Sequence, residues 1–295
     1  EMLEGSSTMD KWERKTGYKM ASDRDVGYRG TKFDKKCFQR QLRELKDDGR
    51  PKMTLEDLHN STVLPIDFKT AQDFILEYEW LGTMGTTKFS YGLYTKEGDL
   101  FAVYCFGVTA GTKVFSQPFG EEHKHEGIVL VRGACAPFAH EHASSYGIGQ
   151  VMPLVREKGY KFVIAYSDLE SGEIGTVYQS TNWMYFGMTS AINYLVRPDG
   201  KRTDPKLIYK YAKKKGITRQ EQLALFMEEG YTFEKANPKL KYIKLIGTRR
   251  ENKELMRKKK FFTYPYLKRK DDMKEVLAEG KQQIKELNKQ YRGEK

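Results

Sequence analysis

The sequence predicts a mixed α/β fold, in which helices flank a central sheet, with an N-terminal helical arm and a basic C-terminal extension. Two observations predict it. Residues 89–94 and 100–108 are strand-like runs around a short Gly-containing turn, which is typical of an antiparallel hairpin. Residues 128–134, 150–158 and 160–167 follow the order strand, helix, strand, which requires a crossover between parallel strands. A sheet that holds both kinds of pairing is mixed.

The elements before the hairpin are predicted to be helical. Apolar residues recur at three- and four-residue spacing over 33–46, which is typical of one helix face packed on a core. The charged stretch 47–51, which contains Gly49 and Pro51, ends that helix. Asp67 is a good N-cap for a second helix over 68–78, because its carboxylate can accept the free backbone N–H groups.

The elements after the crossover alternate between helices and strands. Thr218 and Glu221 form a capping-box pattern that marks the start of one helix. The predicted helices are 176–185, 203–215, 218–230, 249–260 and 270–291, and the predicted strands are 191–196 and 241–246. Residues 1–31 are polar and aperiodic, and we expect a mobile arm there.

Charge divides the chain into three regions with different predicted roles. The arm with one helix, 1–62, has a net charge of +2, the predicted catalytic core, 63–200, has −5, and the C-terminal extension, 201–295, has +15. A basic region beside a mildly acidic one favours a polyanion held by one part while the other part carries out chemistry. The alternative is a solvated basic face with no ligand.

Several classes of protein are excluded or disfavoured. No run of about 18 apolar residues occurs, so no membrane span is predicted. The three cysteines are far apart and odd in number, which favours a reducing compartment such as the cytoplasm over a disulfide framework.

A small-residue turn after strand 128–134 is a candidate anion site. Small residues between a strand and a helix N-terminus let backbone N–H groups approach a phosphate closely. The candidate cofactor-binding residues are Ser144, Ser145, Gly147, Ile148 and Gly149. The turn matches neither a Walker loop nor a dinucleotide fingerprint, and tight packing of the turn is the alternative explanation.

Polar side chains follow the predicted strand 160–167. Asp168 comes where open α/β sheets bind ligands, so it could act as a general base or as a helix cap. Tyr178 could donate a hydrogen bond or a proton, Gln179 and Asn182 could recognise a base edge, and Trp183 could stack on a base. The alternative is that Tyr178 and Trp183 anchor the core.

Two His-x-His pairs, His123 with His125 and His140 with His142, flank Cys135. No established ligand spacing matches them, so no metal is predicted. Arg132, on the preceding strand, could hold a phosphate or carboxylate, or could pair with Glu79 or Asp168.

Basic clusters in the extension are candidate contacts to a DNA backbone, because lysine and arginine give salt-dependent affinity for phosphates. These residues are Lys213, Lys214, Arg249, Arg250, Lys258 and Lys259, the last two beside aromatic residues 261–266. For any single cluster the alternative is a solvated helix face.

Several segments together resemble one family, the phage Mom-like DNA-modification proteins, over roughly residues 65–270. The segments are Glu79-Trp80-Leu81-Gly82-Thr83-Met84-Gly85, Val131-Arg132-Gly133-Ala134-Cys135, 140–145, Ala165-Tyr166-Ser167-Asp168, 172–187, 241–244 and Tyr264-Pro265-Tyr266.

The resemblance implies a GNAT-like acyltransferase fold and the conversion of adenine in phage DNA to a carbamoylmethyl derivative that blocks restriction. It implies that Arg132, Asp168 and Tyr178 are the polar active-site residues and that 144–149 corresponds to the pyrophosphate loop of an acyl-CoA or related activated donor. It also places Glu79 and Trp80 at the substrate, where many relatives have His-Tyr-Leu-Gly instead of the sequence at 79–82.

The sequence therefore predicts a transferase that holds double-stranded DNA and modifies the exocyclic amine of a flipped adenine in the cytoplasm of an infected bacterial host. Two other classes remain open. One is a GNAT enzyme that acts on a small molecule, a protein or RNA, and the other is a DNA-binding protein without catalysis.

Overall fold

The computed structural model describes residues 37–109, 111, 113–189, 193–200, 202–203, 205–235 and 238–267. The predicted arm 1–31 and the predicted terminal helix 270–291 lie outside these residues. Within them, no helix has both the length and the apolar character needed to cross a bilayer.

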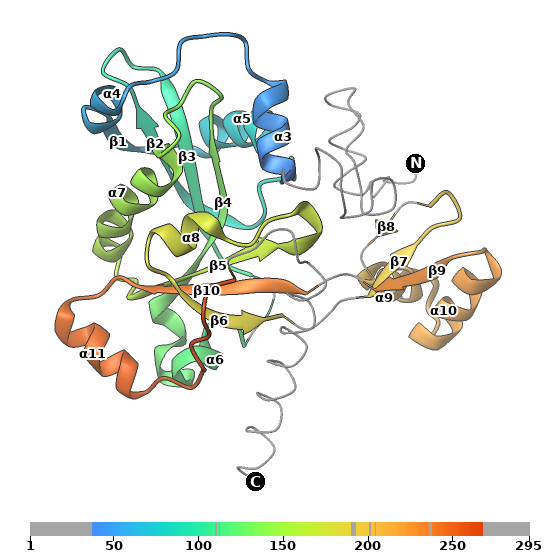
Figure 1. The fold of residues 1–295 in the computed structure, drawn as a ribbon. Coiled ribbons are helices and arrows are strands. Elements are labelled where there is room, and N and C mark those ends of the chain that lie inside the picture. The colour runs from blue at the N-terminus through green and yellow to red at the C-terminus, as the bar shows by residue number, and fades with distance from the viewer. Residues whose placement is uncertain are drawn as a thin grey trace.

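A seven-stranded sheet forms the centre of the molecule (Figure 1). Its order is β1-β2-β3-β4-β5-β10-β6, and among these strands only β4 and β5 pair in parallel. The strands are β1 Thr62–Ile66, β2 Thr87–Tyr94, β3 Leu100–Gly107, β4 Gly127–Cys135, β5 Phe162–Asp168, β10 Lys239–Leu245 and β6 Met184–Met188. The mixed sheet confirms the predicted fold class and both observations that predicted it.

Helices cover both faces of the sheet. On one face, the apolar side of α7 (Ala143–Glu157) packs over the strands with the short α4 (Leu55–His59) and α8 (Thr176–Ser180). On the other face, α5 (Phe68–Tyr78) covers β3 and β4, whereas α6 (Ser116–Phe119) and α11 (Arg249–Arg257) cover β5, β10 and β6. The helix α3 (Phe38–Leu45) packs against Trp80. Two short 3-10 turns are Glu121–Glu126 and Leu169–Ser171.

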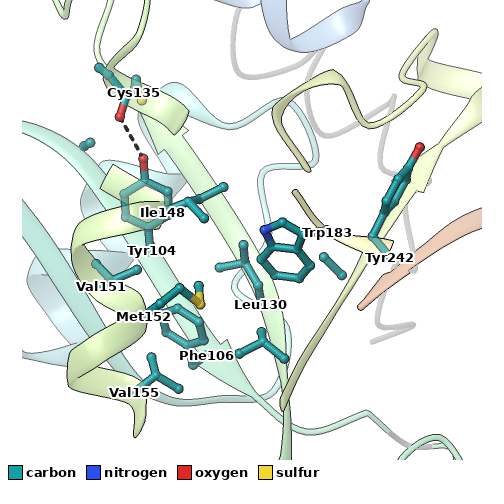
Figure 2. Close-up of a cluster of buried hydrophobic side chains, with 14 of the residues drawn as sticks. Tyr104, Phe106, Leu130, Cys135, Ile148, Val151, Met152, Val155, Trp183 and Tyr242 are labelled. Carbon is teal, nitrogen blue, oxygen red and sulfur yellow. Dashed lines mark hydrogen bonds between the residues drawn. The ribbon is translucent and has the colours of Figure 1, made fainter. Parts of the chain in front are cut away.

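The main core lies between α7 and the sheet (Figure 2). Phe106 and Leu130 from the strands meet Ile148, Val151 and other apolar residues that recur along one side of α7. The burial of these side chains is the largest favourable contribution to folding. Because both faces of β3, β4 and β5 are covered, these strands are apolar along most of their length.

A second, three-stranded sheet is inserted between β6 and β10. Its order is β8-β7-β9, with β7 Asn193–Val196, β8 Arg202–Thr203 and β9 Thr232–Lys235, and it carries α9 (Lys206–Lys215) and α10 (Arg219–Glu228). This small unit, 193–235, has its own apolar cluster. The predicted boundary between 200 and 201 falls inside it, and β10 and α11 return to the main sheet.

Several elements differ from the prediction, including the unpredicted strands β6, β8 and β9, and three of the differences have local reasons. The helix expected at 150–158 begins earlier, at Ala143, and includes Pro153 and the small residues before it. The helix expected over 176–185 ends at Ser180, because Asn182 adopts a left-handed conformation (φ 58°) that few residue types other than Gly and Asn tolerate. Strand β1 was not predicted; it contains Pro65 at the edge of the sheet, where a missing N–H is tolerated.

Candidate active site

Strands β4 and β5 separate after three residue pairs, and this separation sets the geometry of the site. Residues 127–129 pair with 162–164, but the strands continue to Cys135 and Asp168. Beyond the last pair, β4 follows β3, and β5 follows β10. Arg132 and Asp168 therefore lie on the diverging ends of two strands that begin side by side.

Asp168 forms an ion pair with the first residue of β10. The Lys239 Nζ lies 2.9 Å from the Asp168 carboxylate, and the two residues are direct partners in the β5–β10 register. Burial opposes the charge on Lys239, yet the Asp168 carboxylate outweighs burial and raises the pKa of Lys239. Asp168 is thus held in place by a cation that stays charged.

Glu173 is the acidic residue that sequence reasoning missed. Its backbone N–H donates to the Asp168 carbonyl oxygen at 3.1 Å, which folds the segment after β5 back on itself. Burial of the carboxyl group, together with the nearby Asp168 and Glu79, raises the pKa of Glu173 to about 8. The only sequence signal was an acid between Gly172 and Gly175, which free the backbone to make this turn.

Glu79 and Arg132 form the other side of this charged cluster. Glu79 is buried at the end of α5, and its Oε2 lies 3.9 Å from the Arg132 Nε. Burial raises the pKa of Glu79 to about 7, although the Arg132 guanidinium acts against the rise. The same guanidinium donates to the Thr83 carbonyl oxygen and hydroxyl, so Arg132 is fixed to the turn after α5.

Tyr178 lies next to these acids. Its ring centroid is 5.0 Å from that of Trp183 and 5.3 Å from that of Tyr242. Burial and the nearby Glu173 raise the pKa of Tyr178 far above its ordinary value, so the phenol stays protonated and can donate a hydrogen bond. The structure therefore brings Arg132, Asp168 and Tyr178 into one cluster with Glu79, Glu173 and Lys239.

The expected phosphate turn is the beginning of α7, and only part of it can face a ligand. Gly147 is buried against Tyr104, where a Cβ would lie 2.5 Å from the tyrosine oxygen, and Ile148 is a core residue. In contrast, the backbone N–H groups of Ser144 and Ser145 make no hydrogen bond within the described chain, and His142 supplies no side-chain cap. Gly149 is exposed with open space around its Cα. We therefore revise the anion site to the first turn of α7.

Tyr104 connects that turn to the charged cluster. Its hydroxyl donates to the carbonyl oxygens of Ala143 and Ser144 at 3.3 and 2.9 Å. The fully buried Tyr104 also feels the field of Tyr178, which helps to raise its pKa. The start of α7 and Tyr178 are thus neighbours of the same side chain.

Three predicted substrate residues pack or form hydrogen bonds within the fold, and a fourth is exposed. Trp80 packs edge-on against Phe38 with ring centroids 5.4 Å apart, and Trp183 is fully buried in the main core. The Gln179 amide lies 2.9 Å from the Ile174 oxygen and 3.1 Å from both the Tyr242 hydroxyl and the Leu267 oxygen. Asn182 is exposed and closes the turn after α8. Their roles toward a substrate stay predictions.

The predicted DNA-backbone residues lie on two separate elements. Lys213 and Lys214 are exposed at the end of α9 in the small unit. The other four are Arg249 and Arg250 at the start of α11, and Lys258 and Lys259 just after it. Lys258 Nζ lies 3.1 Å from His123 Nε2, whose other ring nitrogen faces Glu126. In the part of the chain that the structure describes, no three His, Cys, Asp or Glu side chains gather as metal ligands.

The mixed sheet, whose parallel strands separate beside a charged cluster, defines an α/β fold of the kind that the sequence predicted. A model of the Mom protein family matches residues 60–266, and the chain belongs to this family. Family membership on this fold supports a transferase of the acyl or alkyl kind.

Comparison with solved structures finds N-acetyltransferases. The ribosomal-protein-S18-alanine N-acetyltransferase from Escherichia coli is 10% identical, with a TM-score of 0.34 over 65% of this chain and 97% of the other. A spermidine/spermine N-acetyltransferase from Vibrio cholerae is 7% identical, with a TM-score of 0.36 over 66% and 98%. A GNAT family acetyltransferase from Elizabethkingia anophelis with acetyl-CoA bound is 12% identical, with a TM-score of 0.32 over 63% and 98%. Comparison with curated proteins finds no match.

Proposed function

We propose that this protein is a transferase that modifies the exocyclic amine of adenine in double-stranded DNA, by carbamoylmethylation or a related acyl or alkyl transfer, so that the DNA resists restriction. The observation that carries the proposal is that the Mom family match, 60–266, contains every member of the charged cluster. A host cytoplasm rich in restriction enzymes is the setting in which this modification is useful.

The cluster supplies what an aromatic amine needs in order to react. The adenine amine is a poor nucleophile and must lose a proton as its new bond forms, so a base with a pKa near the working pH is the most effective. Glu173, with its pKa raised to about 8, meets this requirement. Asp168, held by Lys239, lies beside it and can accept a hydrogen bond that orients the amine.

The remaining members of the cluster stabilise charge and do not take up the proton of the amine. Arg132 is a fixed cation at the diverging end of β4, and Tyr178 is a neutral donor. Both are suited to stabilise negative charge that develops on the group being transferred. Glu79 keeps Arg132 in place and, being buried, adds little opposing charge while it is protonated.

An acyl-CoA or related activated donor is the cofactor that this site favours. The free N–H groups of Ser144 and Ser145, at the positive end of α7, fit a phosphate group. When bound, the donor would supply the electrophilic carbon, and its activating group would leave with the bonding electron pair as the adenine nitrogen binds that carbon and loses its proton. Ser144 also lies next to Tyr104, which is the neighbour of Tyr178, so a donor held there would extend toward the acids.

The first prediction tests the function itself. The chain is expressed in bacteria, total DNA is digested to nucleosides, and the nucleosides are measured by mass spectrometry. We expect a heavier adenine nucleoside from the wild type and none from Glu173→Gln or Asp168→Asn, because these changes remove the base and the orienting carboxylate. Asp73→Asn, on the exposed side of α5, is the matched control and should modify DNA normally.

An unaltered nucleoside profile in cells that contain folded wild-type protein would overturn the proposal. Modified adenine that persists in Glu173→Gln would leave the function standing but would remove Glu173 as the base. Incubation of the purified protein with small-molecule amines, RNA and protein substrates then distinguishes the other transferase class.

A further inference from the structure

The small unit carries a helix face that combines several exposed lysines with an exposed tyrosine. In α9, apolar residues pack inward with Ile208 and Ala212 fully or almost fully buried, while Lys206, Tyr209, Lys210, Lys213 and Lys214 are exposed. Residues three and four apart lie next to one another on a helix surface. Tyr209, Lys210, Lys213 and Lys214 therefore form one continuous patch, which we call the α9 face.

Helix stability alone does not explain the α9 face. Lysines in the last turn interact favourably with the helix dipole, which accounts for Lys213 and Lys214. It does not account for Lys210, which lies four residues before Lys214, because like charges at that spacing destabilise a helix. Lys210, Lys213 and Lys214 form no ion pair within the described residues, and the α9 sequence contains no acid. A polyanion laid along this face would relieve the repulsion.

Tyr209 is the second unexplained feature. Its side chain is 64% exposed in the middle of the lysines, although it is large and apolar enough to be buried. By contrast, the neighbouring Tyr211 packs against Phe226 of α10 with ring centroids 5.6 Å apart. An exposed ring between cations suits a ligand that offers both phosphates and flat or sugar surfaces.

The position of the small unit relates the α9 face to the charged cluster. The unit follows β6 and leads into β10, and Figure 1 shows it beside the start of β10. Tyr194 of β7 contributes to the electrostatic field at Lys239, which holds Asp168. The small unit that carries α9 therefore adjoins the charged cluster through β7.

We propose that the α9 face is the docking surface for the backbone of duplex DNA, with Lys210, Lys213 and Lys214 on phosphates and Tyr209 against the sugar or an unstacked base. The inference rests on the proposed function for the identity of the polyanion. Charge complementarity and the helix geometry support it: α9 rises about 1.5 Å per residue, so the three lysines can reach two or three adjacent phosphates.

The test measures the affinity of the full chain for a short fluorescent DNA duplex of mixed sequence over a series of salt concentrations. Each phosphate contact contributes roughly 0.9 to the slope of log affinity against log salt. We expect Lys210→Gln, Lys213→Gln and Lys214→Gln together to make the slope shallower by about 2 to 3. The control triple variant Lys88→Gln, Lys96→Gln and Lys158→Gln removes the same charge from exposed positions outside the small unit.

Tyr209→Ala separates the aromatic contact from the charge. It should weaken binding roughly tenfold at every salt concentration and leave the slope unchanged. Modified adenine is measured for the same variants. We expect its yield to fall because DNA binding is weaker, although the charged cluster is unchanged.

The outcomes distinguish this inference from the proposed function. If the two triple variants have equal slopes of log affinity against log salt, DNA does not dock on the α9 face, even if the wild type modifies adenine. A specific loss of slope in the α9 triple variant supports the face, even if no modified nucleoside is found. Variants that bind normally but fail to modify DNA also count against docking at α9.

Discussion

At the residue scale, the site is a set of acids whose charges are kept close together. Glu173 lies in the field of Glu79 and Asp168, and the cations Arg132 and Lys239 offset part of this negative charge. Carboxylates so placed repel one another, so at least one of them retains its proton at neutral pH. Such an arrangement costs folding stability and is typical of sites that move protons.

The effect of Glu173 on folding stability can be measured. Because the pKa of Glu173 rises from its ordinary 4.5 to about 8 in the folded chain, the folded state holds the proton more tightly than the unfolded state. Its contribution to stability is therefore complete below about pH 4.5 and is lost as the pH rises through about 8. We expect the free energy of unfolding of Glu173→Gln to rise by about 2 kcal/mol relative to the wild type across that window. This value is smaller than the full pKa shift implies, because Glu173 is half-buried and solvent screens part of the effect.

The measurement is urea unfolding of both proteins at intervals of pH. Glu97→Gln, at the exposed turn between β2 and β3, is the control for the loss of one negative charge. If the difference between Glu173→Gln and the wild type does not change with pH, Glu173 does not titrate as described.

The resemblance to the Mom-like family named Arg132, Asp168 and Tyr178 as candidate site residues. The sequence did not predict the charged residues that surround them in the structure. Asp168 was recognisable because it follows an apolar strand, and Arg132 because it interrupts one. Glu173 was not, because its position depends on the backbone turn that joins its N–H to Asp168. Lys239 lies 71 positions further along the chain than Asp168, and only strand pairing brings the two together.

At the scale of elements, the start of α7 shows how one sequence feature serves two purposes. The small residues 144–149 were predicted to be a loop that holds a phosphate. In the structure they are helical, and Gly147 is small because Tyr104 lies against it. Periodicity could not reveal this, since a glycine that permits close packing and a glycine that admits a ligand have the same appearance in a sequence.

The two glycines of α7 therefore differ in a testable way. Gly147→Ala would place a Cβ 2.5 Å from the Tyr104 oxygen, and we expect it to destabilise the fold by roughly 1–3 kcal/mol. Gly149→Ala meets nothing within 4 Å and should stabilise the helix by about 0.5–1 kcal/mol. Urea unfolding of both variants checks the signs, and shifts of equal size and direction would show that Tyr104 does not limit position 147.

Strands and helices with strong periodicity were predicted well, whereas their sheet partners were not. The hairpin β2–β3 and the unit β4–α7–β5 appear in the predicted order. The position of β10 between β5 and β6 could not be predicted, because nothing in its own alternation specifies a partner. The insertion of a second sheet before β10 hid this connection further.

At the scale of the whole molecule, the small unit is closed at its base. The Thr189 backbone N–H donates to the Lys239 carbonyl oxygen at 2.9 Å, and the Lys239 N–H donates to the Thr189 hydroxyl at 2.9 Å. The chain thus leaves and re-enters the main sheet at one point, as expected of an inserted unit that folds around its own apolar cluster.

A deletion variant tests this organisation. We expect a short Gly-Ser linker in place of residues 190–238 to leave the main sheet folded, because Thr189 and Lys239 already lie within hydrogen-bond distance. The same variant should lose most of its affinity for duplex DNA, because the α9 face is removed. Urea unfolding and DNA binding measure the two effects. An insoluble variant would mean that the main sheet depends on the unit for its stability.

Lys239 connects the inserted unit to the main sheet through both its backbone and its side chain. Its backbone forms hydrogen bonds with Thr189 at the base of the inserted unit, and its side chain forms an ion pair with the Asp168 carboxylate. A shift of the inserted unit relative to the main sheet would therefore also shift the ion-pair partner of Asp168. If duplex DNA docks on the α9 face as proposed, its binding and the placement of the Asp168 carboxylate are coupled through Lys239.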